Sequence, residues 1–306
     1  MTFMKRHLIK ILLFVLVVAL IDVAAGSIFT HLNRIARGGD TARNNYICNK
    51  TTEDVLIFGS SRAIHHYNPS IITDLTGSSC YNCGQDGNGI VLFSGRFHLI
   101  CERYYPRVVI YDVMPLYDLF EGEANGKYLG WLRPYYDKDG IADFFDLVDP
   151  VEKYKMKSQF YRYNSRFVQI ISDCLKPAEE DSCYGFSPLE AQLDTMKLKR
   201  EVIESPVVDT LKIACINKML DEAEGKTRFV FVVSPFWYGQ DASLLEPIRQ
   251  LCHRRGVLLL DYSNNPKYVG KNEYFADGVH LNATGADVFT RDVVARLQQA
   301  GVLNGQ

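Results

Sequence analysis

Two short stretches, one near each end of the 306-residue chain, contain residue types that act together in nucleophilic catalysis. Near the C-terminus, Asp277 precedes His280 by three residues in a glycine-bearing loop that leads into a predicted helix. Near the other end, Gly59 is followed by Ser60 and Ser61, directly after an apolar run. A carboxylate can hold an imidazole in one tautomer, and that imidazole can accept the proton of a serine hydroxyl. The pattern indicates a Ser–His–Asp hydrolytic site assembled from the two ends of one domain.

Each stretch also has a purely structural interpretation. Gly–Ser pairs are frequent at turns and helix N-caps, so the two serines could simply begin a helix. Asp277 and His280 could cap the loop before the last helix, or they could bind a metal ion together. No second cluster of carboxylates and histidines in the sequence supports metal binding. The catalytic interpretation therefore requires that the two stretches meet in space.

Continuous apolar runs of strand length alternate with helical patterns along the chain. The predicted strands cover residues 54–58, 107–113, 227–234 and 257–261. The predicted helices cover residues 69–75, 90–104, 244–255 and 287–299. Strands that are apolar throughout are typical of parallel sheets buried on both faces, and their alternation with helices predicts a doubly wound, three-layer α/β fold. Ligands bind beyond the carboxyl ends of such strands, which is where the serine turn lies.

Two segments interrupt this alternation. Residues 116–205 are long, charged and rich in aromatic side chains, and we expect a largely helical insertion that packs over the active edge of the sheet. Residues 80–89 read as a glycine-rich turn, whose backbone N–H groups could approach a ligand closely. An ordinary connection between a strand and a helix is the simpler interpretation of that turn.

The serine turn, the glycine-rich turn and Asp-x-x-His, in this order, resemble the SGNH (GDSL-like) hydrolase family. The resemblance covers roughly residues 52–300, with the insertion excepted. It implies a flavodoxin-like parallel sheet and a serine esterase mechanism that needs no metal or organic cofactor.

The resemblance also implies roles for individual residues. The family's first block is Gly-Asp-Ser with the serine as nucleophile, so that role falls to Ser61 in this chain. The last block makes His280 the base and Asp277 the residue that orients it. The oxyanion hole would combine the backbone N–H groups of Ser61 and Gly87, with Gly84 as the alternative to Gly87.

One block of the family pattern is missing. The third block, Gly-x-Asn-Asp, should follow the strand at 107–113, but the chain has Tyr111-Asp-Val-Met-Pro115 there. Losing one oxyanion donor can lower turnover about a hundredfold or more, so an active enzyme needs a replacement. Asn88, Arg62 and His65 are the nearby polar candidates. Anchored, exported relatives that lack the third block include acyltransferase-like proteins of cell-envelope polymer modification. The combination of an N-terminal anchor, Gly59-Ser-Ser-Arg62 and an aromatic insertion resembles that branch.

The N-terminus carries a targeting segment. Basic residues precede an apolar stretch, and the run from Leu8 to Phe29 is long enough to span a bilayer as a helix. The positive flank predicts a cytoplasmic N-terminus and an exported remainder. We therefore divide the chain into a membrane anchor (1–29), a polar tether (30–50) and an SGNH hydrolase-like domain (51–303).

A cleaved secretory signal is the alternative to the anchor. Val23-Ala-Ala25 has the small residues of a cleavage site. The apolar character continues past Ala25, with Ile28 and Phe29, and this favours the uncleaved anchor. Both interpretations export the domain.

Charge and cysteine usage narrow the function further. The formal net charge of −2 gives no reason to expect nucleic-acid binding. Eight cysteines in an exported chain permit disulfides, and Cys174 and Cys183, which bracket an acidic segment, are the best pair. A second group has the spacing of a weak zinc motif: Cys80, Cys83, His98 and Cys101. Buried free cysteines are common, and we expect no metal there.

Together these features predict a membrane-anchored, exported serine esterase. We expect its substrate to be an acyl ester, most simply an acetyl ester, of a carbohydrate such as an envelope glycan, because aromatic side chains in the insertion can stack on sugar rings. One alternative is an O-acyltransferase for a cell-envelope glycan, which shares the acyl-enzyme. The other is a non-catalytic, anchored glycan-binding protein, which the missing asparagine supports.

Overall fold

The computed structural model describes residues 3–122, 124–178, 181–198 and 205–304. The chain forms two compact units. The smaller unit comprises residues 1–46 and 126–179, and the larger one comprises residues 47–125 and 180–306. The larger unit contains the sheet, and the smaller unit contains the long N-terminal helix.

Within the described residues, the larger unit is built on one parallel sheet of five strands. The strands are β1 (Val55–Gly59), β2 (Cys80–Asn82), β3 (Val108–Asp112), β4 (Arg228–Val233) and β5 (Leu258–Asp261). They lie in the order β2-β1-β3-β4-β5, and every pairing is parallel. This is the flavodoxin-like order of a doubly wound fold, in which the order of winding reverses between β1 and β3. The predicted fold class is confirmed.

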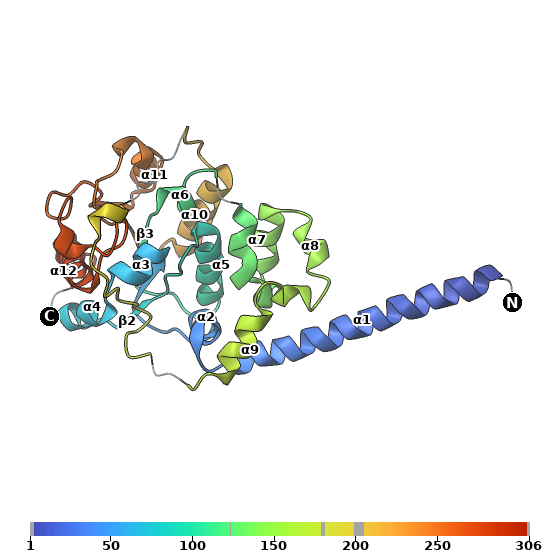
Figure 1. The fold of residues 1–306 in the computed structure, drawn as a ribbon. Coiled ribbons are helices and arrows are strands. Elements are labelled where there is room, and N and C mark those ends of the chain that lie inside the picture. The colour runs from blue at the N-terminus through green and yellow to red at the C-terminus, as the bar shows by residue number, and fades with distance from the viewer. Residues whose placement is uncertain (1–2, 123, 179–180, 199–204, 305–306) are drawn as a thin grey trace. The chain divides into compact units, whose positions relative to one another are not determined.

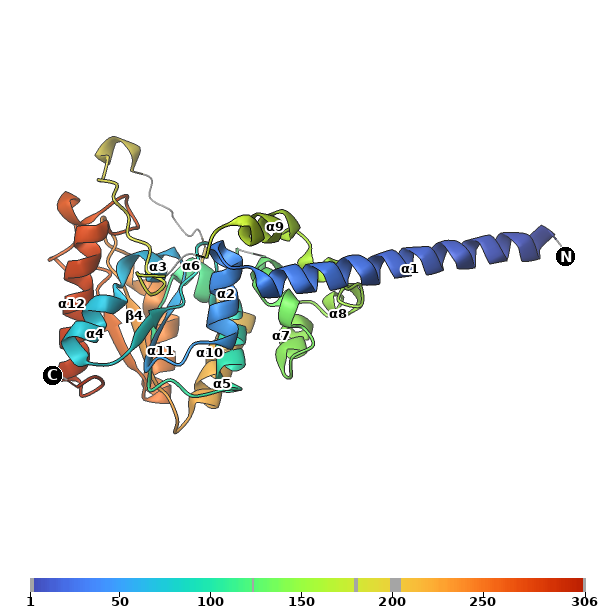
Figure 2. The ribbon, with the colours of Figure 1, turned by 90° about the horizontal axis from the view of Figure 1, so that it is seen from below.

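Helices cover both faces of the sheet (Figures 1 and 2). One face carries α3 (Ser61–His66), α4 (Pro69–Thr76) and α12 (Ala283–Gln299). The other carries α5 (Ile90–Cys101) and α10 (Thr210–Ala223), which pack against each other, and α11 (Glu246–Arg255) lies beside β5. Shorter elements of this unit are α6 (Pro115–Asp118), η4 (Thr195–Lys197), η5 (Ala242–Leu245) and η6 (Asn272–Tyr274).

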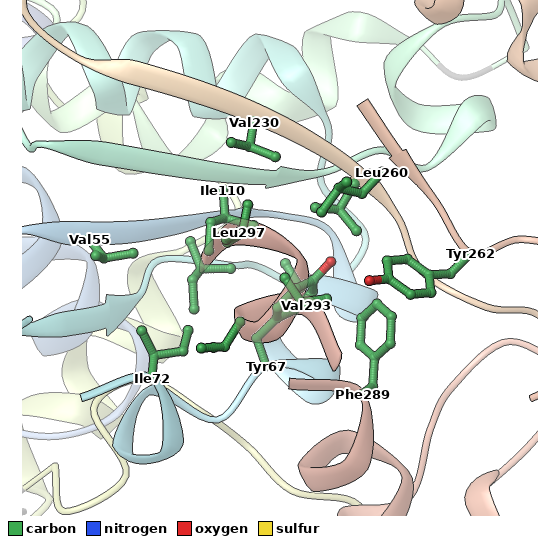
Figure 3. Close-up of a cluster of buried hydrophobic side chains, with 14 of the residues drawn as sticks. Val55, Tyr67, Ile72, Ile110, Val230, Leu260, Tyr262, Phe289, Val293 and Leu297 are labelled. Atoms are coloured by element: carbon green, nitrogen blue, oxygen red, sulfur yellow. The ribbon is translucent and has the colours of Figure 1, made fainter. Parts of the chain in front are cut away.

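The apolar strands supply a core on each face, because alternate side chains point to opposite sides. Toward α12 the strands contribute residues such as Ile57 and Ile110, and the ring of Phe289 packs among tyrosine rings (Figure 3). Toward α5 the ring of Phe58 meets the rings of Phe93 and Phe97. Both faces of the sheet are therefore covered by buried apolar side chains, as continuous apolar strands predict.

Several elements differ from the sequence-based expectation. Strand β2 lies inside the predicted glycine-rich turn at 80–89, and helix α10 was not predicted. Helix α12 begins at Ala283 and not at Asp287, because the side chain of Asn282 accepts a hydrogen bond from the backbone N–H of Gly285 and caps it. The segment 30–50, expected to be a polar tether, is mostly helical.

The smaller unit is helical within its described residues. It contains α1 (Phe3–Ile35), α7 (Ile141–Val148), α8 (Glu152–Lys155), α9 (Phe167–Leu175), η2 (Arg133–Tyr135) and η3 (Tyr161–Tyr163). Helix α2 (Gly39–Asn49) and the turn η1 (Asn125–Trp131) lead from one unit to the other. The C-terminal part of α1 packs against α9 and η3, where the ring of Phe29 stacks on Tyr163. The predicted insertion is therefore mainly helical as far as Leu175, whereas its described residues from Lys176 to Asp194 form turns and loop.

Helix α1 has the length and composition of a membrane-spanning helix. It has 33 residues, and its most apolar window has a mean hydropathy of 2.8, with none of that window buried. A helix of this kind can serve as a membrane anchor, and an N-terminal signal sequence has the same properties.

The expected disulfide between Cys174 and Cys183 is wrong. All eight cysteines are free thiols, and six of them are buried. The Sγ of Cys174 lies 3.1 Å from the carbonyl oxygen of Leu32 in α1, whereas Cys183 is exposed in the larger unit. The spacing of the two cysteines around an acidic segment did not predict a disulfide correctly, because they belong to different units.

The core beneath α12 yields a stability prediction. Leu297 is fully buried in this core, so Leu297→Ala should lower the free energy of unfolding by about 2–5 kcal/mol. The exposed Gln299, two residues further along the same helix, provides the control, and Gln299→Ala should change it by no more than about 0.5 kcal/mol. Chemical denaturation of the detergent-solubilised protein measures both. Equal losses in the two variants would contradict the buried position of Leu297.

Candidate active site

The serine turn joins the end of β1 to the start of α3. Gly59 has a φ of +138°, and a Cβ atom there would lie 2.6 Å from the carbonyl oxygen of Asp112, so the turn requires glycine. Ser60 is 1% exposed, and its Oγ is buried without a hydrogen-bond partner. Ser61 is the first residue of α3 and is half-buried. Of the two serines, Ser61 therefore presents its hydroxyl beyond the carboxyl edge of the sheet.

The loop that carries the histidine, residues 275–281 (the histidine loop), is closed by hydrogen bonds within it. Phe275 and Leu281, both fully buried, form an antiparallel bridge across its base. Between them, Oδ1 of Asp277 accepts hydrogen bonds from the backbone N–H groups of Val279 at 2.7 Å and His280 at 2.8 Å. The Asp-x-x-His spacing thus makes a local turn that fixes the carboxylate beside the imidazole.

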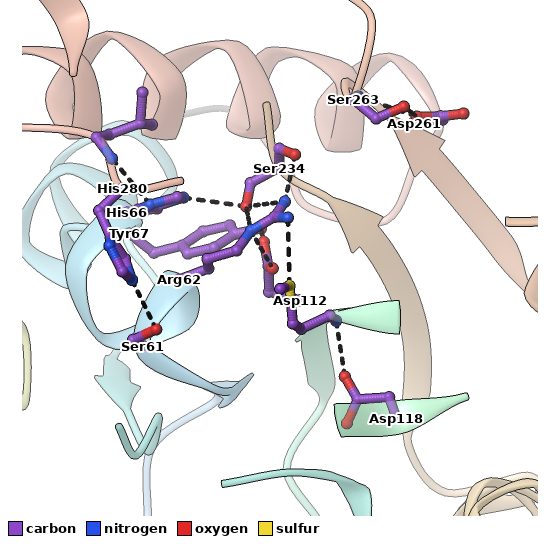
Figure 4. Close-up of polar contacts among 12 residues, drawn as sticks. Ser61, Arg62, His66, Tyr67, Asp112, Asp118, Ser234, Asp261, Ser263 and His280 are labelled. Carbon is purple, nitrogen blue, oxygen red and sulfur yellow. Dashed lines mark hydrogen bonds and ion pairs between the residues drawn. The ribbon is translucent and has the colours of Figure 1, made fainter. Parts of the chain in front are cut away.

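The structure brings the serine turn and this loop into direct contact. His280 Nδ1 lies 2.8 Å from Asp277 Oδ2, and its Nε2 lies 2.7 Å from Ser61 Oγ (Figure 4 shows the second contact). A carboxylate can only accept, so Nδ1 carries the proton and Nε2 is left to accept from the serine hydroxyl. The three side chains have the connectivity of a nucleophile, a base and an orienting acid.

The electrostatics keep Asp277 ionised. Partial burial opposes ionisation, but the hydrogen bond and charge of His280 and the two backbone N–H donors outweigh it, and the pKa of Asp277 falls to about 2. Its carboxylate is therefore negative at neutral pH and stabilises an imidazolium on His280 when the serine proton is transferred.

The two predicted oxyanion donors have unused backbone N–H groups. Among the described residues, neither Ser61 nor Gly87 has an acceptor for its N–H, and Gly87 is exposed in a turn with a φ of +63°. Gly84, the alternative donor, gives its N–H to Oδ1 of Asn82 at 3.0 Å. A Cβ on Gly84 would lie 2.7 Å from the backbone nitrogen of Ile64, so this glycine is needed for close packing against α3.

A buried ion pair occupies the place of the missing third block. Strand β3 ends at Asp112, whose Oδ1 lies 3.4 Å from Nε of Arg62, and both side chains are fully buried (Figure 4). Oδ2 of Asp112 accepts a hydrogen bond from the hydroxyl of Tyr67 at 2.6 Å. Arg62 also donates to Oγ and to the carbonyl oxygen of Ser234, just beyond β4. Arg62, one of three suggested replacements for the missing asparagine, therefore has a structural role below the site.

His66 connects this ion pair to the histidine loop. The backbone N–H of Leu281 donates to Nε2 of His66 at 3.0 Å, so Nδ1 carries the proton and donates to Oγ of Ser234 at 3.0 Å. Burial, with the positive charge of Arg62, lowers the pKa of His66 well below its ordinary value. This neutral imidazole was not recognised from the sequence, although the pair His65-His66 after the serine turn was a signal.

His65 is committed to two acceptors. Its Nδ1 lies 2.6 Å from the carbonyl oxygen of Ser187, and its Nε2 lies 3.1 Å from Oδ1 of Asp86. Burial disfavours the cation, but these two contacts outweigh it and raise the pKa of His65. Because both ring nitrogens face acceptors, the geometry suits an imidazolium. His65 thus ties α3 to the turn that carries Gly87.

Asn88 is the third suggested replacement. Its Nδ2 donates one hydrogen bond to the carbonyl oxygen of Asp86 at 2.7 Å. Its amide group has a second N–H, and it follows Gly87 directly in the chain. Asn88 is thus the candidate that directly adjoins Gly87 and has an amide N–H beyond the contact with Asp86.

Two further segments border the histidine loop. The aromatic run Phe236-Trp-Tyr238 follows β4: the backbone N–H of Trp237 donates to the carbonyl oxygen of Gly278 at 3.1 Å, and Tyr238 packs against Gly278. The second half of the insertion is the other border, since the carbonyl oxygen of Leu189 accepts from the N–H of Ala283 at 2.8 Å. A hollow of about 510 Å³ around Arg107 and Arg228 lies at the opposite, amino end of the strands.

No metal site accompanies this arrangement. Across the described residues, no group of three or more His, Cys, Asp and Glu side chains is placed to hold a metal ion. In the weak zinc motif, Cys80, Cys83 and Cys101 are buried, and Nδ1 of His98 lies 2.7 Å from Glu222.

Comparison with known proteins identifies no family. No family model matches the chain, and no curated protein matches it. Among solved structures, one provisionally assigned as a platelet activating factor from Streptococcus pneumonia aligns at 11% identity and a TM-score of 0.39, covering 95% of this chain and 99% of that chain. A gut microbial diltiazem-metabolizing enzyme aligns at 12% identity and a TM-score of 0.39, covering 81% of this chain and 48% of that chain. Both are distant likenesses.

The lowered pKa of Asp277 predicts a pH dependence of stability. The folded state favours the carboxylate, so its contribution is present above the ordinary pKa of 3.8 and is lost as the pH falls through about 2. Asp277→Asn should therefore flatten the fall of the free energy of unfolding between these two pH values. Acid titration of unfolding measures this, with the same exchange at the exposed Asp74 as the control for removing one carboxylate. An unchanged slope in Asp277→Asn would contradict the stabilisation of this carboxylate by its hydrogen bonds.

Proposed function

We propose that this protein is a serine esterase of the SGNH type. The observation that supports it best is the hydrogen-bonded series from Ser61 Oγ through His280 to Asp277 at the carboxyl edge of a doubly wound sheet. The unused N–H groups of Ser61 and Gly87 agree with an oxyanion hole.

The first half-reaction transfers the acyl group to the enzyme. Ser61 Oγ attacks the carbonyl carbon of the ester while its proton moves to Nε2 of His280. The negative oxygen of the tetrahedral intermediate accepts hydrogen bonds from the N–H groups of Ser61 and Gly87. The intermediate collapses, the bond to the alcohol oxygen breaks, and His280 returns the proton to that leaving oxygen.

The second half-reaction releases the acyl group. His280 takes a proton from a water molecule, whose oxygen attacks the acyl carbon of the serine ester. Collapse of the second intermediate returns the proton to Ser61 and releases a carboxylic acid. If a sugar hydroxyl takes the place of water, the same residues perform O-acyl transfer, so the acceptor alone separates esterase from acyltransferase.

The substrate that we propose is an acyl ester, most simply an acetyl ester, of a carbohydrate such as an envelope glycan. The aromatic run Phe236-Trp-Tyr238 supports this choice, because it borders the histidine loop and two of its rings, Trp237 and Tyr238, are half-exposed. Aromatic faces of this kind can pack against the apolar face of a sugar ring. Asp277 is ionised at neutral pH, and the leaving alcohol departs with a proton from His280. The proposed reaction therefore needs no metal or organic cofactor.

We also propose that α1 remains attached as a membrane anchor, with the larger unit exported. Cleavage after Ala25 would remove Asp22, whose carboxylate accepts hydrogen bonds from Ser158 and from the backbone N–H groups of Gln159 and Phe160. A segment that is cut away in the mature protein has no need of such contacts.

The adjacent serines provide a matched test of the nucleophile. Ser61→Ala should abolish labelling by an active-site serine phosphonate and lower turnover of p-nitrophenyl acetate by at least about a thousandfold. Ser60→Ala should keep both, because its hydroxyl is buried and has no partner. Gel-based labelling and absorbance measure the two effects in the full chain in detergent.

Two outcomes would contradict the proposal. Labelling that disappears in Ser60→Ala and survives in Ser61→Ala would assign the nucleophile to the buried serine. Folded wild-type protein that neither labels nor turns over would favour the anchored glycan-binding alternative, which binding to immobilised glycans then tests.

A further inference from the structure

Helix α1 is attached to the rest of the smaller unit at a defined position along its length. Among its described residues, Asp22 is the first that is not exposed. Its carboxylate accepts hydrogen bonds from the hydroxyl of Ser158 at 2.5 Å and from the backbone nitrogen of Gln159 at 2.9 Å. A Cβ on Gly26, one turn further along, would lie 2.4 Å from Cβ of Gln159, so the segment lies directly against the helix.

The attachment continues along the last turns of α1. The hydroxyl of Tyr163 donates to Oγ1 of Thr30 at 2.8 Å. The ring of Phe29 lies 5.5 Å from that of Phe160 and 6.3 Å from that of Phe167, between ring centroids. The segment 158–167 therefore lies beside α1 from Asp22 to Thr30.

Counting along α1 places this segment in the bilayer. A helix rises 1.5 Å per residue, so about 20 residues cross a hydrocarbon core of about 30 Å. Lys10 is the last basic residue before the apolar run, and 20 residues from Ile11 end at Thr30. The stretch from Asp22 to Thr30 thus corresponds to the outer half of the bilayer. Whatever packs against that stretch lies at the same depth.

The segment has the surface that such a depth requires. Large apolar side chains are exposed on it and next to it, with Val168 at 68%, Tyr154 at 61% and Val151 at 54%. Further members of this exposed set are Phe160, Phe167 and Ile171. In water an exposed apolar set of this size would be unfavourable, whereas acyl chains would cover it.

Basic and aromatic side chains directly precede the residues that contact Asp22. Residues 149–162 include four basic and two acidic residues. The ammonium groups of Lys153 and Lys157 lie 5.6 Å and 5.2 Å from the centre of the Tyr154 ring. These lysines start near the depth of Asp22, and their long stems can carry the ammonium groups outward to the lipid phosphates.

We propose that residues 149–171 form a lipid-facing collar around the outer end of α1, inserted into the outer leaflet. Lipid is favoured over a second protein because the exposed side chains lie on and next to the segment that packs against a membrane-spanning helix. The collar donates hydrogen bonds to the carboxylate of Asp22. Without it, this carboxylate would have no hydrogen-bond donor within the apolar run. The inference depends on α1 as an anchor and is independent of the esterase activity.

Tryptophan fluorescence in vesicles tests the collar. Tyr154→Trp and Val168→Trp are each introduced into the full chain. Each variant is reconstituted into vesicles of phosphatidylethanolamine and phosphatidylglycerol. A second set of vesicles contains lipid that is brominated on acyl carbons near the headgroup. The matched control is Tyr184→Trp, at an exposed tyrosine of the larger unit. Wild-type emission from Trp131 and Trp237 is subtracted, and intact mass confirms that α1 is present.

The expected result is a blue-shifted emission from both collar tryptophans that loses most of its intensity with brominated lipid, while Tyr184→Trp is unaffected. Red-shifted emission that brominated lipid does not quench would show that the face lies in water and would overturn the proposal. Blue-shifted emission without quenching would assign the face to a protein partner or a second copy, and would overturn it equally. Neither result would bear on labelling of Ser61.

Discussion

The buried ion pair between Arg62 and Asp112 is the interaction on which the geometry of the site depends. Arg62 directly follows Ser61, and Asp112 ends β3 in register with Gly59, so the pair joins the serine turn to the neighbouring strand. Ser234 extends the network to the end of β4. Removing one partner of such a pair costs about 3–5 kcal/mol, because the other charge stays buried alone. The backbone of Ser61 is therefore held in place by charges on side chains other than its own.

The same network explains how Ser61 and His280, 219 positions apart in the sequence, come to lie within hydrogen-bonding distance. His66 is on α3, five residues after Ser61, and it holds the backbone of Leu281 next to His280. The histidine loop is thus positioned from below by His66 and from within by Asp277. The end of β3 therefore contributes to the position of the loop through Asp112 and its partners, and not through an asparagine side chain.

The sheet and the contact between Asp277 and His280 could be predicted because their signals are local. Continuous apolar runs identify buried parallel strands, and the spacing of Asp277 and His280 already contains their contact. Strand β2 has three residues, too few for a periodic signal, and the polar composition of residues 30–50 concealed helix α2. The roles of Arg62 and His66 could not be read from the sequence, because a charged residue looks solvent-exposed until its partner on another strand is known.

The three histidines around the site differ in the groups that their ring nitrogens face. Both ring nitrogens of His65 face acceptors, whereas His66 and His280 each face an acceptor at Nδ1 alone. The Nε2 of His66 already accepts the N–H of Leu281, and protonating it would break that hydrogen bond. Nε2 of His280 faces the hydroxyl of Ser61, which can give up its proton. Their hydrogen-bond partners therefore distinguish His280 from the two neighbouring imidazoles, in agreement with its proposed role as the base.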